Sequence, residues 1–371
     1  MRRHSNTPSL GLIAEEAGVS RAAVSMALRN HPRIPEATRL RIQAIANKLG
    51  WKPNPLLAEA MSAIRAGQPP VDRVTLAWIT AHDRRDGWED SPFQKRCFEG
   101  ASIRADNAGY RLDHFWLGDA DGNANRLSEI LYARGITGIV IAPLQEPGRI
   151  HMKWERFAAT TIAYTLIEPR LHRASDNHAA SARVAVARLH AAGRERVGLA
   201  LSARLDHRVN DLWTAGYLLE TMQEEIAVPK LLHRPADIDQ KSFLTWVKKA
   251  KPDAIISTSK LIPQWLEEAG YNVPGDIAYA CLDLPSDDGS MAGIFQDAAS
   301  IGTAAIDMVA GQLLRHERGL PEKPRTNIID GRWIDGATAP PTPGDEAHHY
   351  EAENLLSNRG ELLSSRPVVY D

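Results

Sequence analysis

A group of polar and basic side chains near the amino end has the chemistry needed to contact nucleic acid. Ser20, Arg21 and Ala22 open a helix-length run, and Ser25 follows one helical turn later. Side chains at the front of a helix that enters a major groove reach base edges, and a guanidinium suits bidentate contact with guanine. We therefore expect Arg21 and Ala22 to contact bases, and Ser25 to contact a base or a phosphate.

The elements that must position these side chains are three short helices. Residues 9–17 carry apolar residues on one helical face, and so do residues 21–28. Gly18 between them can take a left-handed turn, and Ser20 can cap the second helix. Two helices joined by such a turn predict a helix-turn-helix. A third helix is expected from Pro35 to about residue 49.

Four segments in this region resemble the DNA-binding head of the lactose-repressor (LacI) family, and the resemblance extends through the body to about Ala339. They are Ala14-Glu-Glu-Ala-Gly-Val-Ser20, Ala23-Val-Ser25, Glu36-Ala-Thr-Arg39 and Leu49-Gly-Trp-Lys-Pro-Asn54. The resemblance implies a homodimeric transcriptional regulator, which we expect to be a repressor. Its partners would be a pseudo-palindromic double-stranded DNA operator and a small-molecule effector, with a sugar or sugar derivative as the leading class.

Three further residues of the head stand at positions that the family uses at DNA. Met26 replaces a frequent Arg, so a base contact is lost or becomes apolar. Arg29 occupies a site that is often Asn, and we expect Arg29 and Asn30 to touch phosphates. For any one of these residues, the alternative is a solvated helix face.

Residues 51–72 are expected to form a hinge helix and linker. Asn54 belongs to the family-like segment, so we count it among the DNA contacts. The family often inserts a Leu of this helix into the minor groove, and its counterpart here is Ala60. Leu57 or Met61 would serve as the wedge. The alternative is that they only pair two hinge helices within a dimer.

The balance of charged residues changes sign at the end of the hinge helix, near Arg65. The net charge is −2, but the balance through Arg65 is +6 and that of the remainder is −8. A basic head on an acidic body indicates that only the head meets an anionic partner. The sequence has neither a signal peptide nor an apolar run long enough to span a membrane, so we expect a cytoplasmic, nucleoid-associated protein. Cys97 and Cys281 have no metal or redox spacing, and we expect two structural thiols.

Enzyme motifs are missing from the sequence. There is no Gly-x-Ser-x-Gly elbow, Walker loop or His-Glu-x-x-His pattern. We expect no catalytic residue, cofactor or metal. Two other classes stay open: a small-molecule-binding module whose head contacts protein, and a sugar-processing enzyme that uses the body.

The body alternates strand and helix signals, which predicts parallel sheets covered on both faces. The expected fold is thus an all-α helix-turn-helix head at residues 1–50 and an α/β body at 73–339, followed by a disordered tail at 340–371. Expected strands are 74–79, 111–116, 138–142, 161–164, 196–201, 254–257 and 277–281. Expected helices are 92–108, 125–134, 179–192, 212–225 and 301–314.

The resemblance implies that the body has two doubly wound parallel-sheet subdomains of periplasmic-binding-protein type. Crossovers would lie near residues 175, 296 and 329. An effector bound in the cleft would change the angle between the subdomains, and the hinge helices would pass that change to the heads.

Three effector ligands are suggested by matches to family positions. Phe93 belongs to a motif whose aromatic residue often packs on the effector, although a core or helix-start role is as plausible. Asp283 matches an Asp that accepts hydrogen bonds from effector hydroxyls, with capping of the following loop as the alternative. Asp176 matches a crossover Asp, so its role is either ligand contact or hinge geometry.

The helix that contains Gly216 departs from the family at a ligand position. Three residues before this glycine the family often has an Arg, whereas this chain has Trp213. Arg208 and Asn210 stand nearby as substitutes. Trp213 would stack on a flat ligand or a sugar ring, or else pack under the helix.

Overall fold

The computed structural model describes residues 10–28, 34–49, 74–222 and 228–341. The chain divides into two compact units, Met1–Val71 and Asp72–Asp371, here called the head and the body. Arg29, Asn30, Asn54, Leu57 and Met61 lie outside the described residues, as do the hinge and nearly all of the tail. Their predicted roles stay predictions.

The head contains the three expected helices, α1 (Leu10–Ala17), α2 (Arg21–Leu28) and α3 (Glu36–Lys48). They share one small apolar core, because each presents a buried stripe at helical spacing. Its buried members are Ile13, Ala14, Ala17, Val24, Ala27, Ile42 and Ala46. The predicted helix-turn-helix is confirmed.

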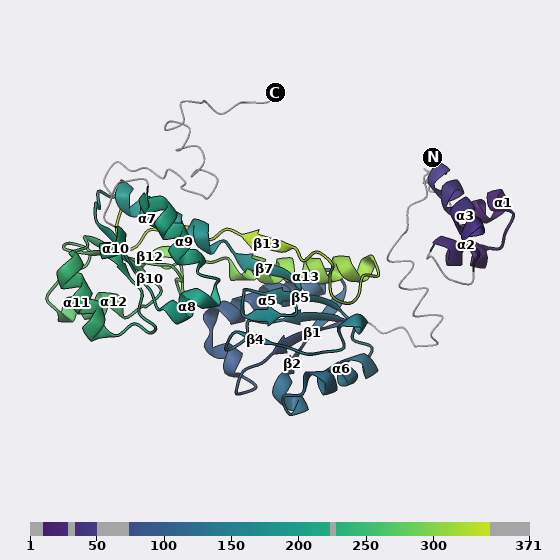
Figure 1. The fold of residues 1–371 in the computed structure, drawn as a ribbon, viewed down its shortest axis with the longest axis horizontal. Helices are drawn as coiled ribbons and strands as arrows, with labels where there is room; N and C mark the ends of the chain where they lie inside the picture. Colours follow the sequence, from purple (N-terminus) through teal and green to yellow (C-terminus); the bar gives the residue numbers. More distant parts are fainter. Residues whose placement is uncertain (1–9, 29–33, 50–73, 223–227, 342–371) are drawn as a thin grey trace, which may run out of the picture. The chain divides into compact units, whose positions relative to one another are not determined.

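The body contains two six-stranded sheets, each with helices on both faces (Figure 1). The first lobe is built on a wholly parallel sheet in the order β13-β7-β5-β3-β1-β2. Its strands are β1 (Val74–Thr80), β2 (Tyr110–Trp116), β3 (Gly138–Ile141), β5 (Ala158–Ile162), β7 (His172–Asp176) and β13 (Thr326–Ile329). Helices α5 (Pro92–Asn107) and α13 (Ala298–Leu314) cover one face, and α6 (Ala124–Ala133) covers the other.

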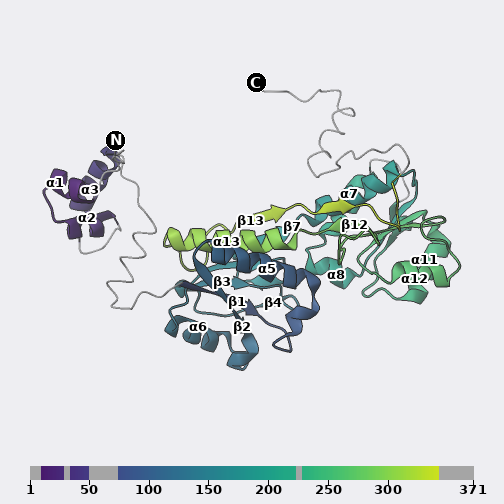
Figure 2. The same ribbon diagram turned by 180° about the vertical axis from the view of Figure 1, so that it is seen from behind.

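The second lobe repeats this plan in the order β14-β12-β11-β10-β8-β9. Its strands are β8 (Val197–Ala200), β9 (Leu232–His233), β10 (Ala254–Ser257), β11 (Ala278–Cys281), β12 (Ala292–Phe295) and β14 (Arg332–Ile334). Helices α7 (His178–Ala191) and α9 (Leu212–Thr221) pack on one face. The other face carries α11 (Gln240–Ala250) and α12 (Ile262–Glu268), as Figure 2 shows from behind.

The remaining elements are short. They are the strand pair β4 (Gly148–Arg149) and β6 (Leu166–Glu168), the helices α8 (Ala203–Arg208) and α10 (Val228–Leu231), and three 3-10 turns at Gly87–Asp90, Leu117–Ala120 and Trp154–Arg156.

Several elements were not predicted, among them β7, β12, α11 and α12, and two predicted features differ in detail. The last strand of the second sheet, β14, pairs antiparallel with β12, so this sheet is mixed. The strand expected at 161–164 instead spans Ala158–Ile162, because Ala163 has a left-handed backbone (φ 57°) that ends the extended segment before Tyr164.

The chain passes between the lobes at the carboxyl ends of three strands. β7 of the first sheet leads into α7, and β12 of the second sheet leads into α13. The third passage joins β13 to β14, and Asn177 donates a hydrogen bond to Asp330 beside it (Nδ2 to Oδ1, 2.7 Å). Because parallel α/β sheets bind ligands beyond the carboxyl ends of their strands, these crossings bring two potential binding edges together.

Candidate functional site

The turn between α1 and α2 is stabilised by the backbone conformation of Gly18 and by a cap from Ser20. Gly18 adopts φ 61°, a conformation open to glycine without strain, and Val19 donates back to the carbonyl of Ala14 at 3.0 Å. Ser20 Oγ accepts a hydrogen bond from the amide of Ala23 at 3.2 Å and caps α2. The predicted cap is therefore present.

The residues predicted to face DNA lie on the outer part of α2. Ser20, Arg21 and Ala22 are exposed, while Ser25 and Met26 are half-buried. The guanidinium of Arg21 lies over Gly11 of α1, where a Cβ added to Gly11 would approach its Nη2 to 2.8 Å.

Helix α3 supports this arrangement through two polar side chains. Arg41 donates to the carbonyl of Ala17 at 3.1 Å, and Gln43 donates to that of Ala27 at 3.2 Å. These carbonyls end α1 and α2, where helices leave acceptors unpaired. The two bonds fix both helices against α3.

In the body, two arginines bridge the lobes. Arg208 of α8 donates to the carbonyl oxygens of Leu144 (Nη2, 3.0 Å) and Gln145, which follow β3 in the first lobe. Arg96 of α5 donates to the carbonyl of Pro285 in the second lobe (Nη1, 2.8 Å). Hydrogen bonds from the guanidinium of Arg208 to two main-chain carbonyl oxygens explain its position without a ligand.

Asp283 lies just beyond β11, at the junction of the lobes. Burial raises the pKa of its carboxyl group, and the charge of Asp176 raises it further. Lys260 and Arg96 oppose this rise, as does His178 to a smaller extent. Groups from both lobes thus surround the predicted effector carboxylate.

Asp176 and Trp213 meet at a residue that sequence reasoning missed, His178. Asp176 Oδ2 accepts from Ser181 Oγ at 3.1 Å and lies 3.2 Å from His178 Nδ1. The imidazole makes an edge contact with the indole of Trp213, with ring centroids 5.0 Å apart. Its only sequence signal was its place directly after the capping residue Asn177, at the end of a crossover.

Trp213 is buried because α9 packs closely on α7. A Cβ at Gly216 would lie 2.2 Å from the carbonyl oxygen of Ala179, so only glycine allows this approach. The indole is 6% exposed and joins the core of the second lobe, as the packing alternative proposed.

The two remaining residues predicted to bind the effector are Asn210 and Phe93. Asn210 is exposed with φ 62° in the turn between α8 and α9. Phe93, in the first turn of α5, is half-buried against the core of the first lobe. Neither contacts Trp213 or His178 through a ring interaction in the part of the chain that the structure describes.

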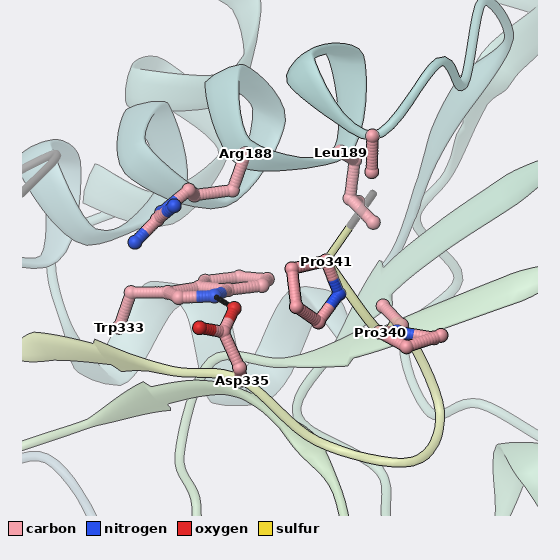
Figure 3. A pocket seen from close by; sticks show the side chains of 8 residues that line it. Arg188, Leu189, Trp333, Asp335, Pro340 and Pro341 are labelled. Atoms are coloured by element: carbon pink, nitrogen blue, oxygen red, sulfur yellow. Dashed lines mark hydrogen bonds between the residues drawn. The ribbon is translucent and has the colours of Figure 1, made fainter. Parts of the chain in front are cut away.

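A small recess elsewhere in the second lobe is too small for an effector. Arg188 of α7 lies over the indole of Trp333 at 6.0 Å, and Trp333 Nε1 donates to Asp335 at 2.7 Å, with Pro341 closing the side (Figure 3). Its volume is about 10 Å³, which is the space of one water molecule.

Residues 10–28, 34–49, 74–222 and 228–341 contain no group of three or more His, Cys, Asp and Glu side chains arranged to hold a metal ion. They also form no helix that is long and apolar enough to cross a membrane.

Two sequence families match the chain. Residues 10–54 match the bacterial regulatory proteins of the lacI family, and residues 186–339 match the periplasmic binding protein-like domain, together just over half of the chain. The chain belongs to the lacI family. Its head is therefore the DNA-binding domain of a family of transcriptional regulators. No curated protein matches this chain.

Solved structures share the fold of this lacI-family chain. A complex of the transcriptional regulator CelR with cellobiose is 16% identical (TM-score 0.55) and covers 89% of this chain and 99% of its own. A lac repressor dimer bound to operator and an anti-inducer is 17% identical (TM-score 0.54), covering 90% and 99%. A CcpA protein from Weissella paramesenteroides with bound glucose is 14% identical (TM-score 0.53), covering 73% and 100%.

Proposed function

We propose that this lacI-family protein is a homodimeric repressor whose affinity for a pseudo-palindromic operator is changed by a small molecule bound between the two lobes. The observation that carries the DNA function is the placement of Arg21 and Ala22, exposed at the start of α2 on a helix whose opposite side lies in the head core. A two-fold operator would engage one such helix per half-site, which is why we propose a dimer.

The lobe junction supports the effector function. Asp283 and Asp176 lie there with cationic partners from each lobe, and Arg208 and Arg96 fasten one lobe to the other. An effector shifts a two-state equilibrium only by binding one arrangement more tightly than the other. Groups that face each other across the junction are suited to that discrimination. The cellobiose and glucose named for the similar structures support a sugar or sugar derivative as the effector.

The test is selection of bound duplexes from a random DNA pool by the full-length protein, with and without a metabolite extract, followed by sequencing. A two-fold symmetric consensus in either condition is the expected result. No enrichment in both conditions would overturn the proposal and favour a binding module whose head contacts protein. Turnover of a sugar substrate by the purified protein would favour the enzyme alternative.

A further inference from the structure

A groove lies at the end of the second lobe that faces away from the junction with the first lobe. It forms where helices α11 and α12 end and strands β10 and β11 begin, whereas the chain crosses between the lobes at the carboxyl ends of strands. Its volume is about 520 Å³, within the range of ligand-binding clefts in proteins. The groove is therefore separate from the region in which the effector is proposed to bind.

The groove combines an apolar floor with a basic rim. Three buried residues form the floor, namely Val247, Pro252 and Ile277. Lys248 and Lys251 are exposed beside them, and neither ammonium group has an acidic partner in the part of the chain that the structure describes. One carboxylate, that of Asp276, also lines the groove, so the lining keeps a net positive charge. An occupant with carboxylates next to apolar side chains would fit both parts.

The conformation of Lys251 is unusual for a lysine. The residue ends α11 with φ 51°, and its amide donates to the carbonyl of Val247 at 2.8 Å. Glycine is favoured at such a helix end, because a Cβ is strained in this conformation. Lys248 and Lys249 already complement the dipole at this end of the helix. The side chain of Lys251 is therefore better explained by a partner in the groove than by the helix itself.

The carboxyl-terminal sequence of the chain has the composition that this groove requires. Residues 342–371 contain six acidic and two basic residues. Four of the acidic residues lie between positions 345 and 353, where there is no Lys or Arg, and Leu355 and Leu356 come shortly after them. The segment 345–356 thus places carboxylates next to a pair of leucines.

This segment follows a residue that lies at the same end of the second lobe. Pro341 lies beside the end of α7. Shortly after that helix, Arg194 Nη2 donates to the carbonyl of Pro274 at 2.7 Å, and Pro274 lies two residues before Asp276 of the groove. Residues 342–349 can span roughly 26–29 Å when extended. The layers of the lobe are spaced by about 10 Å each, so the segment can pass around the sheet to the groove.

We infer that residues 345–356 bind in this groove of the same chain, with their carboxylates at Lys248 and Lys251 and the two leucines on the apolar floor. Side chains two residues apart in an extended chain point to the same side, so Glu351 and Glu353 can face the two lysines together. This inference does not depend on the proposed function, because neither the head nor the lobe junction takes part.

The test is hydrogen exchange on the full-length protein, measured on the backbone amides of residues 270–277. Lys248→Glu combined with Lys251→Glu should expel the segment and speed exchange at these amides at least about threefold. Adding Glu351→Lys and Glu353→Lys to that protein should restore slow exchange, because the charges are exchanged across the same contact.

The matched control is Lys249→Glu, which lies beside Lys248 on α11 but does not line the groove. This control should leave exchange unchanged. Unchanged exchange in the double lysine variant, or an equal increase in the Lys249→Glu protein, would overturn the inference. Failure of the exchanged charges to restore slow exchange would overturn it as well.

A disulfide test asks whether the segment comes from the same chain. Cys97 and Cys281 are buried, so they do not compete for oxidation. Lys248→Cys combined with Glu353→Cys should form a disulfide within one chain. The control pair is Lys241→Cys with Glu353→Cys, which uses the start of the same helix and should react at least about tenfold more slowly. A disulfide between two chains, or equal rates for the two pairs, would reject the inference.

Discussion

The buried carboxylate of Asp206 accepts a hydrogen bond from Nε of Arg234 at 2.9 Å. Thr214 Oγ1 of α9 donates to the same carboxylate at 2.5 Å, and Arg234 also donates to Asp211. Asn210 and Asp211 both have positive φ values in the turn that these bonds enclose. The pair therefore fixes the start of α9, and with it Trp213.

Replacing Asp206 with Ala should destabilise the protein by about 1–3 kcal/mol, because Thr214 and Nε of Arg234 lose their buried acceptor while Arg234 keeps its pair with Asp211. Urea unfolding measures the change. The control is Asp237→Ala, which removes a pair with Arg204 (3.0 Å) whose side chains are both mostly exposed. That change should cost less than about 1 kcal/mol. Similar losses for the two variants would show that the Asp206 pair contributes no more than a surface pair.

Replacing Arg21 with Ala should weaken binding to the selected operator by roughly 1–3 kcal/mol and relax the preference at one base pair. The reason is the loss of a bidentate contact to a base edge. Affinity measured on a set of single-base operator variants gives both quantities. Arg111→Ala, an exposed arginine of β2 that pairs with Asp113, serves as the control. An equal loss on every sequence would instead place Arg21 at a phosphate.

Replacing Arg208 with Ala should favour an arrangement in which the two lobes lie further apart. The guanidinium makes two hydrogen bonds to main-chain carbonyls across the junction, and bonds to charged groups contribute about 1.5–3 kcal/mol each. We expect a larger radius of gyration in solution scattering and a shifted effector concentration for half-maximal change in operator binding. Arg204→Ala on the same helix removes an ion pair with Asp237 of the second lobe and should change neither. Unchanged scattering of the Arg208 variant would mean that its two bonds do not set the lobe angle.

Replacing Asp283 with Asn should weaken effector binding without loss of stability. The lost charge-assisted bond to a hydroxyl would cost roughly 1.5–3 kcal/mol of binding free energy. Calorimetry with the sugar bound by the wild type measures this loss. Full affinity in the variant would leave Asp283 the role of capping its loop.

The difference in stability between the wild type and Asp283→Asn depends on pH in a defined direction, because only the wild type titrates at this position. Burial raises the pKa of Asp283 above its unfolded value of about 3.9, so the folded state takes up this proton more readily. The protonated carboxyl group of Asp283 therefore contributes to the stability of the folded wild type at pH values below the unfolded pKa. This contribution is lost as pH rises through the raised pKa of the folded state. At pH 7 Asp283→Asn should be at least as stable as the wild type.

Asp288 in the following loop provides the opposite case. Hydrogen bonds from Ser290, followed by one from Ser286, lower the pKa of its carboxyl group. Its contribution to stability is present above the unfolded pKa and is lost as pH falls through the lowered one. Denaturant unfolding of Asp283→Asn and Asp288→Asn at several pH values measures this. Plotted against pH, the difference in unfolding free energy from the wild type should have opposite slopes for the two variants.

Many of the helices and strands could be predicted from local sequence patterns. The first two helices of the head depend on apolar spacing, on Gly18 and on the Ser20 cap, all within residues 10–28, and they appear where expected. The same holds for strands such as Val74–Thr80 and helices such as α5, whose hydrophobic runs are continuous. Elements with short or mixed patterns, such as β7, β12, α11 and α12, were not anticipated.

The sequence by itself determined the architecture of the head, the α/β character of the body and the family to which both belong. Only the tertiary structure decided which side chains meet at the lobe junction. Arg208 reaches Leu144, 64 residues away, and His178 lies between Tyr164 and Trp213. The physical reason is that helix and strand patterns depend on neighbours along the chain, whereas the junction depends on crossovers that bring the ends of two separate sheets together.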